Sequence, residues 1–478
     1  MISALCRILV LAGALIASLP ALDLKAVAGP TAPLLTARMP LLLAGWQELT
    51  VTSYRLHGIH DPAWDADLVK LLEHIATREA QAPGALAEED ARAIALRLAD
   101  AGCRDPLAAW ASFILATDSQ ERTTTCSKAL HAFADDRGAR PATELHPHLL
   151  EVMCLGYALA TFGRADDPGK HTKALGVAQR LATALSAAIA AKECSACPEI
   201  LLSQVRGLGL NHQDFGEPVV AAVDVGVQRA QPAPWLGAAL RGTVRIGNAW
   251  AWRGSGWGNS VTPEGWAGFK SNLTQADAML TTAWQGQRGE PLIAAYGCVL
   301  AGAGASTTPI QEWLLRSASA CLDHQPAFDT TFSFLLPRWG GSYAKMLSLG
   351  CDCVDTARFD TEVPWNIMKA VDAAFSDAAS MKQEADFTTA LAAPHVQAAL
   401  EACFDGYLAK KPEQATRYAC NRAALRWLGG RKAEARSALA VIPDSAFARP
   451  ADAYLGVDLK SVKDGKATGP TGQGASDF

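Results

Sequence analysis

The segment FSFLLPRWGGSYAKMLSLGCDCVDTARFDTEVPW, Phe332 to Trp365, limits the fold of this chain more than any other stretch. It predicts the end of one helix, a turn at Pro-Arg-Trp-Gly-Gly, a second helix and a second proline stop. Helix–turn–helix units of this kind stack on one another, because one unit cannot bury its own apolar stripe. We find no catalytic constellation around the segment, so it indicates architecture rather than chemistry.

The same pattern of helix starts and apolar stripes continues along most of the chain. Thr262 and Pro263 predict a capped start, and apolar residues then recur at spacings of three and four up to Trp284. Further starts are predicted at Asp61-Pro62, at Pro106, at the capping box Thr308-Pro309-Ile310-Gln311 and at Ser342. Convincing alternating strands are scarce. The sequence therefore predicts an all-α fold of stacked antiparallel helix pairs, a tetratricopeptide-like α-solenoid.

Three segments resemble parts of a known family. They are PWLGAALRGTVRIGNAWAWRGSGWGNSVTPEGWAGF (Pro234 to Phe269), LLPRWGGSYAKML (Leu335 to Leu347) and AGCRDPLAAW (Ala101 to Trp110). They are similar to segments of bacterial tetratricopeptide-like helical-repeat proteins that carry a domain of unknown function, here described as PRWGGS-type. The resemblance covers Asp61 to about Ala374. It implies a helical-repeat fold and carries no activity, cofactor or catalytic residue to this chain.

The first residues of the chain predict a secretory signal. Arg7 supplies a positive charge, and the apolar run from Ile8 to Leu19 is shorter than the ~20 residues that a membrane span needs. Ala26-Val27-Ala28 offers a small-x-small cleavage site, a cut after Ala21 is the second option, and an uncleaved anchor is the third. No later segment is long and apolar enough to span a membrane. We therefore expect export to the periplasm or cell envelope, or secretion.

The expected domain organisation follows from composition and pattern. After a signal at residues 1–28 and a lead-in at 29–60, we expect helical repeats at 61–206, a Gly- and Pro-containing seam at 207–234, the PRWGGS-type helical domain at 235–380, further repeats at 381–462 and a disordered tail at 463–478. No long linker forces a boundary between Asp61 and Pro443.

The chain has 12 cysteines, and all except Cys6 follow the predicted signal. In an oxidising compartment many of them should pair. Cys403 and Cys420 lie about equally far from the turn at Lys410-Lys411-Pro412, so antiparallel helices would bring them face to face as a disulfide. The CxxC motif Cys194-Ser195-Ala196-Cys197 has no thioredoxin-like βαβ setting, which favours a structural pair over a redox site. Other pairings stay open: Cys321 with Cys351 or Cys353, and the partners of Cys103, Cys126 and Cys154.

Tryptophans supply the main candidates for binding. Eight lie in one stretch: Trp250, Trp252, Trp257, Trp266, Trp284, Trp313, Trp339 and Trp365. Trp250 and Trp252 are about 200° apart on a helix and cannot share a face. Trp250 continues an inner stripe, whereas Trp252, Arg253 and Trp257, beside several glycines, are expected to line a surface groove. Core packing is the expected role of most of the others.

The Arg338-Trp339-Gly340-Gly341 sequence predicts a structural corner in preference to a ligand-gripping loop. Trp339 is expected to fill a gap, Arg338 to cap carbonyls at the preceding helix end, and the two glycines to permit positive φ. On this hypothesis Trp339→Ala costs about 3–5 kcal/mol, the penalty of a large-to-small core substitution.

The sequence does not predict a catalytic, cofactor-binding or metal site. G-x-S-x-G, P-loop and dinucleotide motifs are missing. His57 and His60 lack a third ligand at plausible spacing, and His146 and His148 are two apart and would diverge on a helix. The net charge is −5 with scattered Lys and Arg, which excludes a basic nucleic-acid footprint. The candidate carboxylates lie mostly at predicted caps or solvated faces: Glu264, Asp277, Glu290, Glu312, Asp323, Asp355, Asp360 and Glu362.

These observations favour a binding protein over an enzyme. The first hypothesis is an exported scaffold that binds an unidentified protein or peptide through a concave face or groove. The alternative is an exported polysaccharide-active enzyme on an (α/α) helical toroid, with tryptophans as sugar platforms. A purely structural envelope component is a third option.

Overall fold

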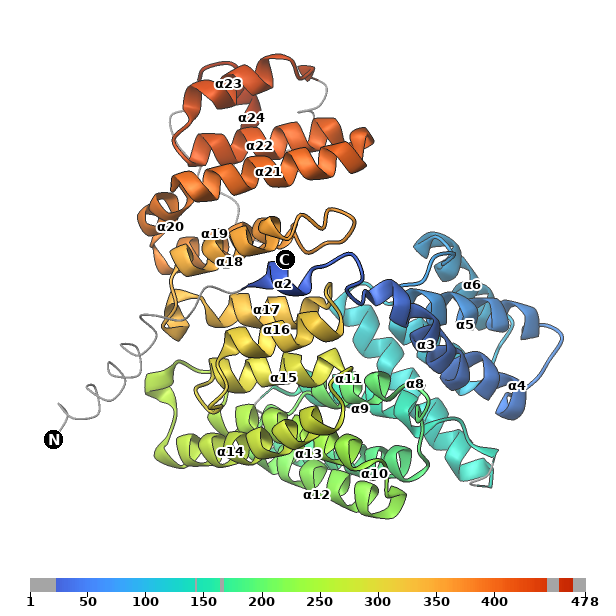
Figure 1. The fold of residues 1–478 in the computed structure, drawn as a ribbon. Helices are drawn as coiled ribbons and strands as arrows, with labels where there is room; N and C mark the ends of the chain where they lie inside the picture. Colours follow the sequence, from blue (N-terminus) through green and yellow to red (C-terminus); the bar gives the residue numbers. More distant parts are fainter. Residues whose placement is uncertain (1–22, 142–143, 164–166, 445–454, 467–478) are drawn as a thin grey trace. The chain divides into compact units, whose positions relative to one another are not determined.

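The computed structural model describes residues 23–141, 144–163, 167–444 and 455–466 (Figure 1). The described residues are all-α: 75% of them are helical, and no strand occurs among them. The predicted fold class is therefore confirmed. The helices divide into two compact units, unit 1 with Met1–Pro33 and Pro309–Phe478, and unit 2 with Leu34–Thr308.

Unit 2 is a run of helices in which most pack against the next one along the chain. The elements are α3 (Leu35–Gln47), the π-helical turn η1 (Glu48–Thr52), α4 (Ser53–His57), α5 (Asp65–Glu79), α6 (Glu88–Asp100), α7 (Pro106–Leu115), α8 (Ser119–Ala139), α9 (His148–Thr161), α10 (Pro168–Ala190), α11 (Pro198–Arg206), α12 (Gln213–Ala230), α13 (Pro234–Arg253), the short η3 (Gly258–Ser260), α14 (Pro263–Gly286) and α15 (Pro291–Gly302). Because α11 is short, α10 also packs directly on α12.

Local capping explains where these helices begin. Helix α14 starts at a proline, and Thr262 Oγ1 accepts a hydrogen bond from the Gly265 N–H at 3.0 Å, as the sequence predicts. The start expected at Asp61 was wrong, since α5 begins at Asp65. The Asp61 carboxylate instead accepts from the Ala63 N–H at 2.8 Å and closes the turn that precedes the helix.

A partly buried ionic cluster joins three helices of unit 2. Arg38 of α3 lies 2.6 Å from Glu199 of α11 and 2.9 Å from Glu290, whose side chain caps α15 by accepting from the Leu292 N–H. Burial, followed by the charge of Glu199, raises the pKa of Glu290 to about 7, although Arg38 opposes the shift. Glu290 therefore has two structural roles: it caps α15 and it forms an ion pair with Arg38.

Unit 1 is a second run of helices that includes a short N-terminal one. The elements are α2 (Leu24–Val27), α16 (Ile310–Ala320), α17 (Gln325–Phe334), the short η4 (Pro337–Trp339), α18 (Tyr343–Asp355), α19 (Asn366–Met381), α20 (Glu384–Leu391), α21 (Pro394–Lys410), the short η5 (Pro412–Gln414), α22 (Ala415–Leu428), α23 (Lys432–Ala440) and α24 (Leu459–Lys463). Helix α2 packs on α16 and α18, and α21 packs on α22 (Figure 1).

The boundaries differ from those expected at two places. The segment 207–234 contains helix α12 rather than a seam, and the two units divide at Pro33/Leu34 and Thr308/Pro309. The glycines of α12 permit close packing instead of a linker, since a Cβ at Gly216 would lie 2.1 Å from Asn248 Oδ1. Residues 23–28, expected within the signal, form or flank α2, where Leu24 is fully buried. Most of the predicted tail lies outside the described residues.

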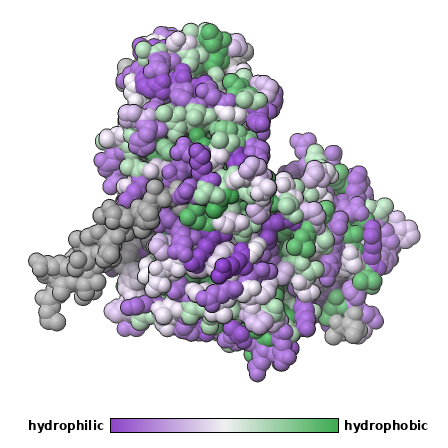
Figure 2. Space-filling model, in the orientation of Figure 1, coloured by the Kyte–Doolittle hydropathy of each residue, from purple (hydrophilic) through white to green (hydrophobic). Residues whose placement is uncertain are grey.

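The surface is mixed in character. On the face drawn in Figure 2, hydrophilic and hydrophobic side chains are interspersed over both units. Within the described ranges no helix is long and apolar enough to cross a membrane. Several large apolar side chains are exposed to solvent, and three of them are tryptophans: Trp257, Trp266 and Trp339.

Candidate functional site at the α13–α14 corner

Four side chains gather where α13 ends and α14 begins, and we name them the aromatic corner: Trp250, Arg253, Trp257 and Trp266. Helices α13 and α14 pack side by side (Figure 1), and Gly254 ends α13 with a φ of 74° that favours glycine. Trp257 is 65% exposed and Trp266 is 42% exposed. The corner thus presents two large aromatic surfaces to solvent.

Arg253 holds this corner together. Its Nη1 donates to the carbonyl oxygens of Gly254 and Gly256, both at 3.0 Å. Its guanidinium carbon lies 5.5 Å from the ring centroid of Trp250 and 5.7 Å from that of Trp266, within cation–π range. Burial lowers the pKa of Arg253, but a guanidinium remains protonated at neutral pH. One cation therefore orients two indoles and the loop that carries Trp257.

A buried phenylalanine supports the two indoles from below. The ring centroid of Phe269 lies 5.0 Å from that of Trp250 and 5.8 Å from that of Trp266, and both contacts are edge-to-face. The backbone next to Trp257 also approaches this group, because a Cβ added at Gly258 would lie 3.8 Å from Trp266 Cζ2. The exposed rings are consequently anchored on a packed base.

Trp252 does not belong to the exposed group, so the expected groove of Trp252, Arg253 and Trp257 needs correction. The indole N–H of Trp252 donates to Glu217 of α12 at 3.0 Å. Its ring covers Gly268 of α14, where a Cβ would lie 2.2 Å from Trp252 Cδ2. Trp252 therefore joins α12, α13 and α14. Trp266 belongs to the exposed aromatic group instead. The sequence predicted a core position for Trp266, because it lies on the apolar stripe of α14.

The predicted corner at Arg338 to Gly341 is a turn, but its side chains differ from the expectation. Trp339 is 39% exposed and packs beside Phe334, so it does not fill a buried gap. Arg338 lies 3.3 Å from the buried carboxylate of Asp377 on α19 instead of capping the preceding helix. Gly340 has a φ of 87°, whereas Gly341 is required by close approach, because a Cβ there would lie 1.9 Å from Leu335 O.

The expected disulfide between Cys403 and Cys420 is not formed in the structure. Cys403 is fully buried, and its Sγ donates to the carbonyl oxygen of Pro364 at 3.5 Å. It therefore contacts the segment before α19. Equal distance from a turn sets the height of a residue along a hairpin but not the face on which it lies.

A different pair of thiols is in contact in unit 2. The Sγ of Cys126 on α8 donates to the carbonyl oxygen of Cys154 on α9 at 3.2 Å. A hydrogen bond with the Cys154 thiol lowers the pKa of the Cys126 thiol, while burial and the same contact raise the pKa of Cys154. The packing of α8 on α9 therefore brings these two cysteines together.

Ser53, His146 and Asp105 form a set with the composition of a hydrolase triad. Ser53 Oγ lies 2.8 Å from His146 Nδ1, and His146 Nε2 lies 3.4 Å from Asp105 Oδ2. The side chains of His146 and Asp105 are fully buried, and the carboxylate of Asp105 already accepts from the N–H groups of Leu107 and Ile59. Ser53 is itself only 4% exposed, so the set lies in the interior, where it connects α4 to the N-cap of α7.

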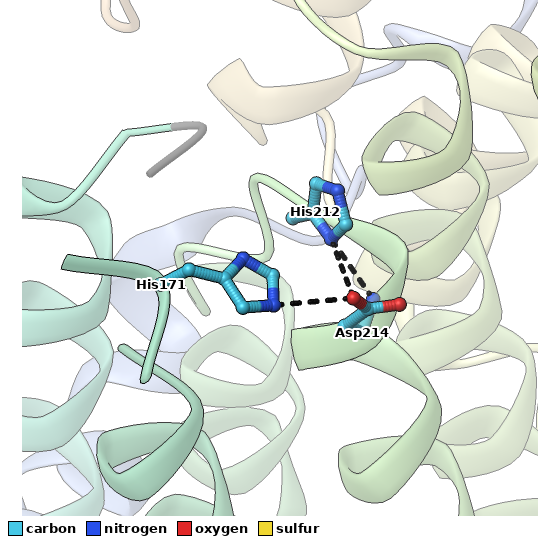
Figure 3. A group of neighbouring side chains, drawn as sticks. All are labelled: His171, His212 and Asp214. Atoms are coloured by element: carbon cyan, nitrogen blue, oxygen red, sulfur yellow. Dashed lines mark hydrogen bonds and ion pairs between the residues drawn. The ribbon is translucent and has the colours of Figure 1, made fainter. Parts of the chain in front are cut away.

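One further group has the chemistry of metal ligands. Among the described residues, His171, His212 and Asp214 are the set of three whose ligand atoms lie within 4.8 Å of one another (Figure 3). His171 comes from the first turn of α10, and the other two come from the start of α12. The sequence did not predict this group, since nothing in it indicates that α10 and α12 pack directly.

No family model matches the chain, and neither a curated protein nor a solved structure matches it. The resemblance to bacterial helical-repeat proteins therefore stays a prediction from sequence. The function has to be inferred from the chain's own geometry.

Proposed function

We propose that this protein is an exported helical-repeat scaffold that binds a protein or peptide through the aromatic corner. The observation that carries the proposal is the exposure of Trp257 and Trp266 on a base organised by Arg253. Tryptophan and arginine are enriched among the residues that dominate binding energy at protein interfaces. An exposed indole is unfavourable in water, so its exposure suggests a surface that a partner covers.

Preorganisation supports the same proposal. The hydrogen bonds of Arg253 to two loop carbonyls and the packing on Phe269 fix the indoles before any partner arrives. A ligand that meets fixed rings loses less conformational entropy on binding than one that must order them. The apolar run from Ile8 to Leu19, which follows Arg7 in the sequence, supports the export part of the proposal.

The binding part is tested by selecting peptides from a displayed random library on the purified full-length chain. Selected peptides are then titrated into the wild type, Trp257→Ala and Trp266→Ala by calorimetry. Each substitution is expected to weaken binding at least about 30-fold, the loss typical of an interface hot spot. Trp339→Ala is the matched control, because it removes a 39% exposed tryptophan from unit 1; its affinity should equal that of the wild type.

Two outcomes would count against the proposal. Selection of no saturable binder, or of binders that ignore both corner substitutions, would remove the corner as the binding surface. Incubation with polysaccharides tests the alternative: release of new reducing ends that is lost in Trp257→Ala would favour a polysaccharide-active enzyme. Export is tested separately by fusing Met1–Pro33 to alkaline phosphatase, which is active only outside the cytoplasm.

A further inference from the structure

We propose that His171, His212 and Asp214 bind a divalent transition-metal ion, with Zn²⁺ as the reference ion. The three side chains point toward one another from two helices that pack together (Figure 3). His171 Nε2 lies 3.2 Å from Asp214 Oδ2, and His212 Nδ1 lies 3.5 Å from the same oxygen. Two imidazoles and one carboxylate form a ligand set that zinc accepts, with a fourth position left to water or a ligand.

The distances fit a metal geometry. Zinc bonds to imidazole nitrogen and carboxylate oxygen are about 2.0–2.1 Å long, which places two ligand atoms of a tetrahedral site roughly 3.3–3.4 Å apart. The two separations to Asp214 Oδ2, 3.2 and 3.5 Å, lie on either side of that value. The third separation, between the ligand nitrogens of His171 and His212, is at most 4.8 Å. Small rotations of partly exposed rings can shorten it.

The surroundings leave the ion a route in and keep the rings in place. The side chains of His171, His212 and Asp214 are 29%, 25% and 49% exposed, so water can reach the fourth position. The buried ring of Phe215 lies 5.2 Å from the His171 ring and 5.4 Å from the His212 ring, which limits how far they turn. Packing of this kind reduces the entropy lost when the ligands are ordered.

Helix capping alone explains the positions of two members of the group, His212 and Asp214. His212 caps α12, since its Nδ1 accepts from the Asp214 N–H at 3.2 Å, and an acid at the first turn of a helix is favourable. An ion bound at Nδ1 would replace this hydrogen bond, because both use the same ring lone pair. Neither the cap nor the acid requires His171, which belongs to α10 and approaches the same carboxylate oxygen. A salt bridge uses His171 only in its protonated form, whereas a metal requires neutral imidazoles. The two explanations therefore predict opposite dependence on pH.

The test measures Zn²⁺ binding by untagged full-length protein, with accessible thiols alkylated beforehand and residual metal removed by a chelator. Competition with a chromophoric chelator should give one site per chain, and affinity should fall as the pH drops from 7.5 to 5.5. His171→Ala, Asp214→Asn and His212→Asn should each weaken binding at least about tenfold. Asparagine keeps an N-cap acceptor at position 212, so this variant removes the imidazole while preserving the helix start.

The control is His131→Ala, which removes an exposed histidine of α8 outside the group and should bind as the wild type does. Circular dichroism confirms that each variant is folded. Substitution of Co²⁺ should give the visible absorption of a tetrahedral nitrogen–oxygen site. Failure to bind one equivalent, or equal affinity in the wild type and all three ligand variants, would overturn the proposal and leave the group as a salt bridge beside a helix cap. Neither result bears on the aromatic corner.

Discussion

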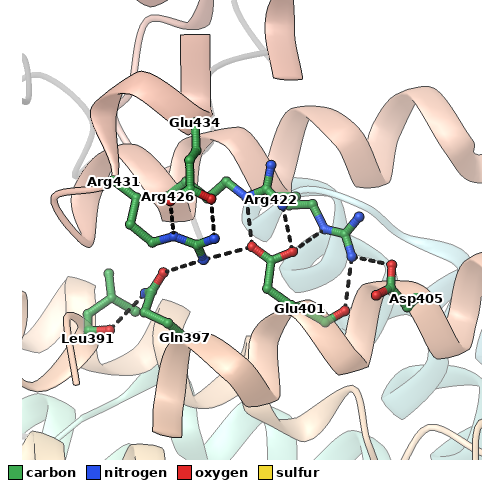
Figure 4. Close-up of polar contacts among 8 residues, drawn as sticks. All are labelled: Leu391, Gln397, Glu401, Asp405, Arg422, Arg426, Arg431 and Glu434. Carbon is green, nitrogen blue, oxygen red and sulfur yellow. Dashed lines mark hydrogen bonds and ion pairs between the residues drawn. The ribbon is translucent and has the colours of Figure 1, made fainter. Parts of the chain in front are cut away.

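Glu401 of α21 is surrounded by three arginines, and we predict that Glu401→Gln loosens the packing of α21 on α22 (Figure 4). Arg426 holds the carboxylate with two hydrogen bonds, Nε to Oε1 at 2.7 Å and Nη2 to Oε2 at 2.8 Å. Arg422 Nε lies 2.8 Å from Oε2, and Arg431 Nη1 donates to Oε1 at 2.9 Å. Removal of one negative charge thus leaves three guanidinium groups facing one another.

The magnitude follows from the burial and the contacts. Glu401 is 23% exposed and the three arginines are 19–29% exposed, so solvent screens the cluster only in part. A hydrogen bond to a charged group contributes about 1.5–3 kcal/mol, and glutamine can keep a weaker subset of these bonds. We therefore expect the free energy of local opening to fall by about 2–4 kcal/mol.

The pH dependence gives an independent check. Burial favours the protonated form of Glu401, but the hydrogen bond from Arg426 and the charges of the three arginines outweigh it and lower the pKa. A lowered pKa in the folded state contributes stability that is complete above the unfolded value of about 4.3 and is lost as the pH falls through the folded value. The difference between wild type and Glu401→Gln should be full at pH 7 and shrink below about pH 4.

Hydrogen–deuterium exchange of the full chain, read by mass spectrometry on peptides from α21 to α23, measures this change. Protection of these peptides should fall on the order of 30- to 1000-fold at pH 7. Glu434→Gln is the control, because Glu434 also contacts Arg431 but its side chain is 53% exposed, and its exchange should match the wild type. The reasoning is refuted if Glu401→Gln exchanges like this control, or if its effect persists undiminished once the carboxyl is protonated.

Three further predictions concern stability and redox state. Trp313→Ala removes a fully buried ring and should lower the free energy of unfolding, measured for the full chain in urea, by about 3–5 kcal/mol. Trp339→Ala should lower it by only about 1–2 kcal/mol, because Trp339 is 39% exposed; equal losses would contradict the burial argument. Because the pKa of Glu290 is raised to about 7, the folded state binds this proton more tightly than the unfolded state does. The free energy of unfolding should therefore decline as the pH rises from about 4.5 to 7, and Glu290→Gln should remove this decline. An unchanged dependence of stability on pH in the variant would contradict this reasoning. Oxidised glutathione should link Cys126 to Cys154, with two hydrogens passing to glutathione; a peptide map that shows other links and leaves these two as thiols would disprove it.

Helix identity could be predicted from sequence wherever a cap and an apolar stripe agree. The starts of α14 after Thr262 and of α18 after Ser342 are of this kind, and both hydroxyls accept backbone hydrogen bonds in the structure. The capping box expected at Thr308 failed. Helix α16 begins at Ile310, and Pro309 is its N-cap without any side-chain hydrogen bond. With ψ of 151°, Pro309 is extended, so it precedes the helix instead of opening it.

The candidate sites were less predictable because they depend on which faces neighbouring helices cover. Trp266 shares the spacing of buried residues such as Leu273, yet it lies in the first turn of α14 and remains 42% exposed. Periodicity gives the direction of a side chain, whereas burial needs the partner helix to extend that far. The group of His171, His212 and Asp214 depends on direct packing of α10 on α12, which the sequence does not reveal.

The two cleavage positions predicted from the sequence would leave the mature chain with different contacts. Leu24 is fully buried in unit 1, and Asp23 caps α2 by accepting from the Ala26 N–H at 3.0 Å. Arg358 then donates to the carbonyl oxygens of Ala28 and Gly29 at 3.3 and 2.8 Å.

A cut after Ala28 would remove α2 from α16 and α18 and place a new ammonium group beside the Arg358 guanidinium. A cut after Ala21 keeps all of these contacts. If the protein is exported as proposed, sequencing of its mature N-terminus should therefore begin at Leu22. A mature chain that begins at Gly29, with stability equal to one that retains α2, would show that these contacts do not matter to the fold.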